Sequence, residues 1–149
     1  MAKFVYKMQS ILNIKYKLEE QAKTEYGIAN QKLREEEQLL QDLLLRRAKY
    51  EQLAEKLMTG TIDIVKIKEN RRAIDAMKKL VRDQMLKVHV AEKNLKVARE
   101  KLNNVMVERK AHEKLKEKAF EEFKQELAAE ESKEIDQLVS YTYHDKEES

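Results

Sequence analysis

Residues 57–67 read LMTGTIDIVKI, and in this stretch the high charge density of the chain falls away. Gly60 suits the left-handed backbone position just past the end of a helix, and Thr61 is a residue type that caps the start of the next helix. The β-branched residues that follow are poor helix formers. A short strand is the alternative, but the sequence offers it no partner strand. The stretch therefore predicts a turn over residues 59–61 between two helices.

The composition of the 149-residue chain is typical of long helices. Charged residues make up 40% of it, aromatic residues 6%, and it has no proline, cysteine or tryptophan. An ordinary soluble domain is about a quarter charged and contains roughly 5% proline. The apolar residues occur singly or in pairs between charges, so the chain can bury a stripe along a helix but hardly a compact core.

The apolar residues of the first half follow a helical stripe. The members of this stripe are Ile11, Leu18, Ala22, Tyr26, Ala29, Leu33, Leu40, Leu44 and Ala48. Four of them, from Ile11 to Leu44, are spaced by eleven residues. An eleven-residue repeat has 3.67 residues per turn, so it predicts a stripe that runs nearly straight or with a slight right-handed supercoil.

The second half has a seven-residue repeat, with six consecutive heptads from Ile67 to Leu102. Such a run is a strong signal for a coiled coil. Two amides, Asn70 and Gln84, fall on the companion positions of this seam, where they would lower stability and fix register. Beyond Val105 the apolar seam is interrupted by polar and charged residues, and it then resumes. The interrupting residues are Arg109, His112 and Lys116, and the later apolar ones are Phe120, Phe123, Leu127, Ile135 and Leu138.

Together these patterns predict an all-α fold, in which two long helices form an antiparallel coiled-coil hairpin as a single domain. Reflection about Gly60 places residue i opposite residue 120 − i, so Phe4 should lie near Lys116. The second helix should then extend past the first from about Ala119. This overhang should pack on a partner, on another copy or on the N-terminal residues of its own chain. The expected elements are a first helix over about 3–58, a turn over 59–61, a second helix over about 62–139 and a disordered tail over 140–149.

The residues argue against catalysis and against bound metals or cofactors. The three histidines, His89, His112 and His144, are isolated, and two glycines cannot build a phosphate-binding loop. A two-helix hairpin also provides no cavity for acid–base chemistry. No apolar run approaches the roughly 20 residues of a membrane span. The lysine-rich start faintly resembles a transit peptide or a membrane-surface helix, although the first turns of a packed helix explain it better.

The charges are unevenly distributed along the chain. Residues 66–118 contain 17 Lys/Arg and 8 Asp/Glu, whereas residues 121–149 contain 3 and 10. This asymmetry suits electrostatic docking to a partner protein, although an unevenly charged, solvated helix surface is the alternative. Nucleic-acid binding is disfavoured, because acids are interleaved with the bases and stacking aromatics are absent between Ile67 and Val105.

Both ends of the sequence resemble the flagellar FliJ family. The N-terminal string is FVYKMQSILNIKYKLEEQAKTEYGIA, residues 4–29, and the C-terminal string is HEKLKEKAFEEFKQELAAEESKEIDQL, residues 112–138. The resemblance implies a non-enzymatic stalk or escort protein of the bacterial flagellar type III export apparatus, at the cytoplasmic face of the cell membrane. Its implied partners are the hexameric export ATPase, the membrane export gate protein and the export chaperones. A general coiled-coil scaffold or chaperone adaptor without an ATPase partner is the alternative.

The resemblance also implies two sets of site residues. The ends of the two helices away from the turn would enter the ATPase ring. The residues implied for this contact are Phe4, Met8, Ile11, Phe120, Phe123 and Leu127. A gate-binding stripe on the first helix corresponds to Leu39, Leu43, Arg46 and Tyr50. Leu43 and Tyr50 fit the Leu/Tyr pattern of the family, whereas Leu39 and Arg46 depart from it. Packing between the helices is an equal alternative for Leu43 and Tyr50. On the second helix, Glu69 and Arg72 stand where the family often has aromatics.

Overall fold

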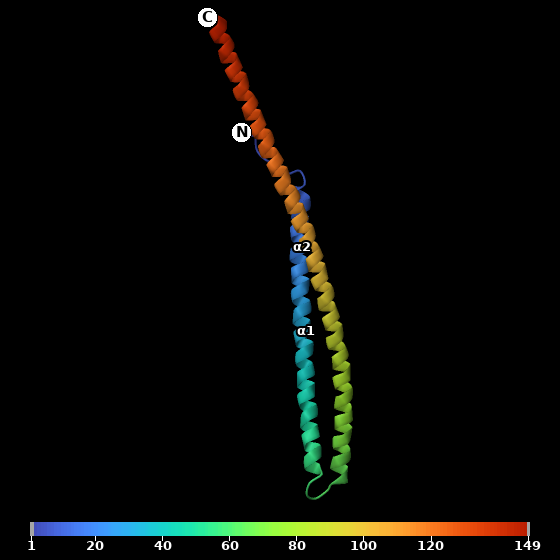
Figure 1. Ribbon diagram of the computed structural model, residues 1–149. Helices are drawn as coiled ribbons and strands as arrows, with labels where there is room; N and C mark the ends of the chain where they lie inside the picture. The colour runs from blue at the N-terminus through green and yellow to red at the C-terminus, as the bar shows by residue number, and fades with distance from the viewer. Residues whose placement is uncertain (1, 149) are drawn as a thin grey trace. The chain divides into compact units, whose positions relative to one another are not determined.

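The computed structural model describes residues 2–148, and its regular elements are helix α1 (Gln9–Leu57) and helix α2 (Ile64–Glu148) (Figure 1). The predicted all-α class and the helical hairpin are confirmed. Two compact units make up the chain. The turn unit comprises residues 20–103, and the terminal unit combines residues 1–19 with residues 104–149. Met1 and Ser149 lie outside the described residues.

The turn is built around Gly60, as the sequence predicted. Gly60 has a φ of +75°, in the left-handed region that a residue without a Cβ adopts at low cost. The hydroxyl of Thr59 donates to the carbonyl of Lys56 at 2.8 Å and satisfies one of the last carbonyls of α1.

The cap of the second helix differs from the expected one. Thr61 lies in the turn, and α2 begins after Asp63. The Asp63 carboxylate accepts hydrogen bonds from the backbone N–H groups of Val65 at 3.1 Å and Lys66 at 3.4 Å. A carboxylate also suits the positive end of the helix dipole, which a threonine hydroxyl does not exploit. Asp63 therefore replaces Thr61 as the N-cap.

In the turn unit, the heptad seam of α2 packs against α1 and includes both predicted amides. Asn70 and Gln84 are buried. The Asn70 side-chain amide donates to the carbonyl of Tyr50 at 3.0 Å, and that of Gln84 donates to the carbonyl of Glu36 at 2.9 Å. Both pairs fit the relation between i and 120 − i, so the register near the turn is as predicted.

The seam of α1 differs from the predicted eleven-residue stripe. Ile11, Leu18 and Leu44 are each about two-fifths exposed, whereas Leu12 is 1% exposed. The buried and half-buried residues of α1 recur every seven residues and include charged side chains. One row consists of Leu12, Glu19, Tyr26, Leu33, Leu40, Arg47 and Ala54, and the other of Lys15, Ala22, Ala29, Glu36, Leu43, Tyr50 and Leu57. The structure thus replaces the eleven-residue repeat with a heptad repeat.

In the terminal unit, residues 2–8 are not helical, so α1 begins later than the expected position near residue 3. Phe4 in this segment contacts Phe120 and Phe123 on α2, beyond the expected Lys116. The shift is already present within the helices of this unit, where Glu19 pairs with Arg109 and Tyr16 with Glu113. Helix α2 continues through residues 140–148, which the sequence placed in a tail. Residues 128–144 are all exposed, including Ile135 and Leu138.

Candidate partner-binding sites

The terminal unit joins the N-terminal segment to α2 through three phenylalanines. The ring centroid of Phe4 lies 5.1 Å from that of Phe120, in an edge-to-face arrangement at 62°, and 5.4 Å from that of Phe123. We call these three residues the aromatic cluster. Such ring pairs contribute about 0.5–1.5 kcal/mol beyond the area they bury. A pocket of about 410 Å³ lies beside the cluster and is lined by Phe4, Glu113, Lys116, Glu117 and Phe120.

The other three residues predicted to bind the ATPase have different environments. Leu127 is half-buried, and Met8 and Ile11 lie largely towards solvent. The buried side chain at the start of α1 is Leu12, the neighbour of Ile11. The structure therefore brings Phe4, Phe120 and Phe123 together and leaves Met8 and Ile11 available for other contacts.

A polar cluster of four residues interrupts the apolar seam of the terminal unit. It consists of Tyr16, Glu19, Arg109 and Glu113. The Arg109 guanidinium donates to both carboxylate oxygens of Glu19, with Nε–Oε2 at 2.7 Å and Nη2–Oε1 at 3.2 Å. Arg109 Nη1 also donates to Glu113 at 3.0 Å, and the Tyr16 hydroxyl donates to the other oxygen of Glu113 at 2.6 Å.

This polar cluster explains why the sequence pattern becomes irregular at Arg109. The Glu19 side chain is only 7% exposed and that of Arg109 17%. A bidentate contact matches the planar guanidinium to the carboxylate and compensates the cost of removing both charges from water. Sequence reasoning noted Arg109 as an interruption but missed Glu19. The signal was the seven-residue step from Leu12 to Glu19.

The hydrogen bonds of the polar cluster shift the ionisation of its members. The Tyr16 hydroxyl, and after it the Arg109 guanidinium, hold the pKa of Glu113 below its usual range. The same hydrogen bond to Glu113 raises the pKa of Tyr16. The pKa of Arg109 is raised above its usual value, chiefly by its hydrogen bonds to Glu19. At neutral pH the cluster therefore holds a charged arginine between carboxylates.

A similar polar contact lies in the turn unit. The Gln84 amide donates to the Glu36 carboxylate as well as to its backbone carbonyl, and Lys32 pairs with that carboxylate at 3.0 Å. The Gln84 hydrogen bond, followed by that of Lys32, lowers the pKa of Glu36. A glutamate thus occupies a seam position because a glutamine on α2 satisfies it.

The predicted gate stripe on α1 lies at one edge of the seam. Leu43 and Tyr50 are half-buried in the heptad rows, while Leu39 and Arg46 are exposed. The helix therefore presents two members of the stripe to solvent and packs the other two partly against α2. Glu69 and Arg72 on α2 are exposed.

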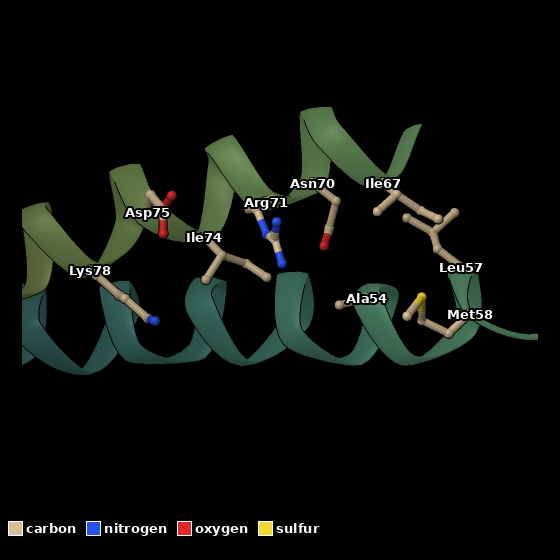
Figure 2. Close-up of a pocket in the computed structure, with 9 residues that line it drawn as sticks. All are labelled: Ala54, Leu57, Met58, Ile67, Asn70, Arg71, Ile74, Asp75 and Lys78. Carbon is tan, nitrogen blue, oxygen red and sulfur yellow. The ribbon is translucent and has the colours of Figure 1, made fainter. Parts of the chain in front are cut away.

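A groove of about 250 Å³ begins where this stripe ends. It lies between α1 and α2 near the turn, and Figure 2 shows side chains of both helices pointing into it. In that view Arg71 extends from α2 towards α1. Its lining residues are Ala54, Leu57, Met58, Ile67, Asn70, Arg71, Ile74, Asp75 and Lys78. This groove was not predicted, because its lining combines residues from two helices on both sides of the turn.

The part of the chain that the structure describes has neither a metal-binding cluster nor a membrane-spanning helix. Among residues 2–148, no group of three or more His, Cys, Asp and Glu side chains is arranged to hold a metal ion. Within the same residues, neither helix is apolar enough over a sufficient length to cross a membrane.

Comparison with known proteins relates nearly the whole chain to one family. The family described as the flagellar FliJ protein matches residues 4–148. No curated protein and no solved structure matches the chain. The matched range includes the aromatic cluster, the polar cluster and the groove near the turn.

Proposed function

We propose that this chain, which belongs to the flagellar FliJ protein family, is the stalk or escort protein of the flagellar export ATPase. Membership of the family implies a component of the flagellar protein export apparatus. In our proposal the chain is not an enzyme. It binds the hexameric ATPase at the cytoplasmic face of the cell membrane, promotes its assembly and turnover, and links it to the export gate protein and to export chaperones.

The aromatic cluster is the observation that carries this proposal. Phe4 near the start of the chain and Phe120 and Phe123 on α2 form one packed group. A ring-shaped partner that encloses the aromatic cluster would meet the N-terminal segment and this part of α2 at once. Phe120 remains about two-fifths exposed, and Lys116 and Glu117 line the pocket beside it. Aromatic side chains at the centre of a patch, with charged residues at its rim, are typical of the anchors of protein interfaces.

The double variant Phe120→Ser, Phe123→Ser tests the ATPase site. We expect the apparent affinity for the cognate export ATPase to fall at least about tenfold, because truncation of a central anchor commonly costs 2 kcal/mol or more. The measurement is ATP hydrolysis by the export ATPase as a function of the concentration of this protein. Electron microscopy of ring formation provides a second readout.

A matched control is the double variant Leu138→Ser, Val139→Ser on the same helix. Both side chains are about two-thirds exposed and lie outside the aromatic cluster. The control should stimulate hydrolysis like the wild type, and both variants should keep their helical circular dichroism. Full stimulation by the Phe120, Phe123 variant would show that the ATPase site lies elsewhere. If the wild type itself leaves turnover and assembly unchanged, only the scaffold or chaperone-adaptor function remains.

The variant Tyr50→Ala tests the proposed gate site. We expect binding to the cytoplasmic part of the export gate protein to weaken about tenfold, as for a tyrosine anchor. Because Tyr50 also packs partly in the seam, Tyr50→Phe serves as the packing control and should retain most of the affinity if the ring makes the contact. Isothermal titration calorimetry measures both. Undiminished binding by Tyr50→Ala would assign Tyr50 to packing alone.

A further inference from the structure

The turn carries four large apolar side chains that the hairpin does not bury. Met58 is 68% exposed, Ile62 59%, Ile64 65% and Val65 64%. We call these four residues the apolar turn. The neighbouring seam residues Leu57 and Ile67 are half-buried, so the packing of the two helices explains those two but not the apolar turn. Contiguous exposed apolar residues of this kind usually mark an interaction surface.

Five basic residues flank the apolar turn. We call Lys56, Lys66, Lys68, Arg71 and Arg72 the basic collar, and all five are exposed. Among the described residues, none of the five belongs to an ion pair. Residues 56–72 contain only two acids, Asp63 and Glu69. The Asp63 carboxylate caps the N-terminus of α2, where the helix dipole offsets part of its charge. The collar therefore presents a net positive charge.

We propose that the apolar turn and the basic collar dock on the surface of an anionic lipid bilayer. The apolar side chains enter the boundary between headgroups and acyl chains, and the collar contacts lipid phosphates. The turn is the end of the hairpin in the turn unit (Figure 1), and its four apolar side chains are exposed there. A fluid bilayer needs no preformed cavity to accept exposed apolar side chains that are flanked by lysine and arginine. A protein partner would need a complementary groove.

This inference does not depend on the proposed ATPase or gate contacts. It needs only the turn unit and lipid, so it can fail while the proposed function stands, and the reverse also holds. Docking of the turn on lipid would keep the chain at the membrane surface without a membrane-spanning segment.

Sedimentation of the full-length chain with vesicles tests the proposal. We expect binding to vesicles of phosphatidylglycerol and phosphatidylcholine that weakens as salt is raised, and little binding to phosphatidylcholine alone. The triple variant Lys66→Gln, Lys68→Gln, Arg72→Gln should bind about a hundredfold more weakly, because each basic residue near an anionic surface contributes about 1 kcal/mol. The double variant Ile62→Ser, Ile64→Ser should lose at least about tenfold.

Matched controls come from the same unit. Leu86→Ser, Val97→Ser removes two side chains that are about two-thirds exposed, and Lys93→Gln, Lys96→Gln removes two exposed charges away from the turn.

Because no tryptophan is present, Ile62→Trp reports directly on the turn, and its fluorescence should shift to shorter wavelength with anionic vesicles. The proposal would be overturned if the chain bound no vesicles, or bound neutral and anionic vesicles equally. Equal binding by the turn variants and the control variants would also overturn it. Loss of binding to the gate protein alone would assign the apolar turn to a protein contact instead.

Discussion

Replacing Leu12 with alanine is expected to lower the free energy of unfolding by about 3 kcal/mol. The Leu12 side chain is 1% exposed and among the largest that are fully buried. Its truncation removes apolar contacts and leaves a cavity between α1 and α2 in the terminal unit. Urea denaturation followed by circular dichroism measures the loss as a change in the unfolding midpoint at constant slope.

The adjacent Ile11 provides the matched control for this experiment. Ile11 is 39% exposed, so Ile11→Ala should cost only about 1 kcal/mol. The pair distinguishes the heptad seam from the eleven-residue stripe, because the stripe contains Ile11 and the heptad contains Leu12. A larger loss for Ile11→Ala than for Leu12→Ala would contradict the packing described above.

The seam of α1 was predicted only in part. Ala22, Tyr26, Ala29, Leu33 and Leu40 of the predicted stripe lie in it, whereas Ile11, Leu18 and Leu44 do not. The predicted stripe contains only apolar residues, so it takes Leu18 in place of the neighbouring Glu19 and leaves out seam positions that carry a charged residue. Glu19 and Glu36 are such positions, and the structure buries both. Arg109 on α2 satisfies the Glu19 carboxylate, and Gln84 on α2 together with Lys32 satisfies that of Glu36. This compensation depends on the pairing of two distant segments, which periodicity within one helix does not reveal.

The seam of α2 and the turn were predictable because their signals are local. Six heptads of apolar residues define the face of α2 without reference to α1, and a glycine defines the left-handed turn. The relation between i and 120 − i follows from that turn and holds for Asn70 and Gln84. It fails in the terminal unit, where Glu19 pairs with Arg109 and Phe4 with Phe120. The N-cap at Asp63 was not predicted because two residues able to cap a helix, Thr61 and Asp63, lie two positions apart.

The candidate sites were predicted only in part. The sequence placed Phe4, Phe120 and Phe123 in one group on the strength of a family resemblance, and the structure brings their rings together. Their role in ATPase binding stays a prediction, as does the gate-binding role of Leu39, Leu43, Arg46 and Tyr50. The basic collar was visible as part of a basic segment, but the exposure of the apolar turn beside it required the structure.

The single variant Arg109→Leu is expected to lower the midpoint of thermal unfolding by roughly 10 °C. The substitution takes the bidentate partner from the buried carboxylate of Glu19. The double variant Glu19→Leu, Arg109→Leu should unfold at or above the wild-type temperature, because apolar residues at facing seam positions avoid the desolvation of both charges. Differential scanning calorimetry measures all three proteins.

An exposed ion pair provides the control. Lys101 pairs with Glu25 at 2.8 Å, and both side chains are about half exposed. Lys101→Leu should change the unfolding midpoint by no more than about 2 °C, because water and salt screen such pairs. If the double variant unfolds at as low a temperature as Arg109→Leu, the Glu19–Arg109 pair stabilises the terminal unit more than apolar residues in its place would.

The same variants distinguish the polar cluster by its dependence on pH. The pKa of Glu113 is lowered in the folded state by Tyr16 and Arg109, so its contribution to stability is complete above the unfolded-state value of about 4.3. That contribution is lost as the pH falls through the lowered folded-state pKa. The double variant Glu19→Leu, Arg109→Leu lacks Arg109, so it has less of this stabilisation to lose at low pH. Its unfolding midpoint should therefore rise relative to that of the wild type as the pH is lowered below about 4.3, and a constant difference would mean that Arg109 does not stabilise the ionised Glu113.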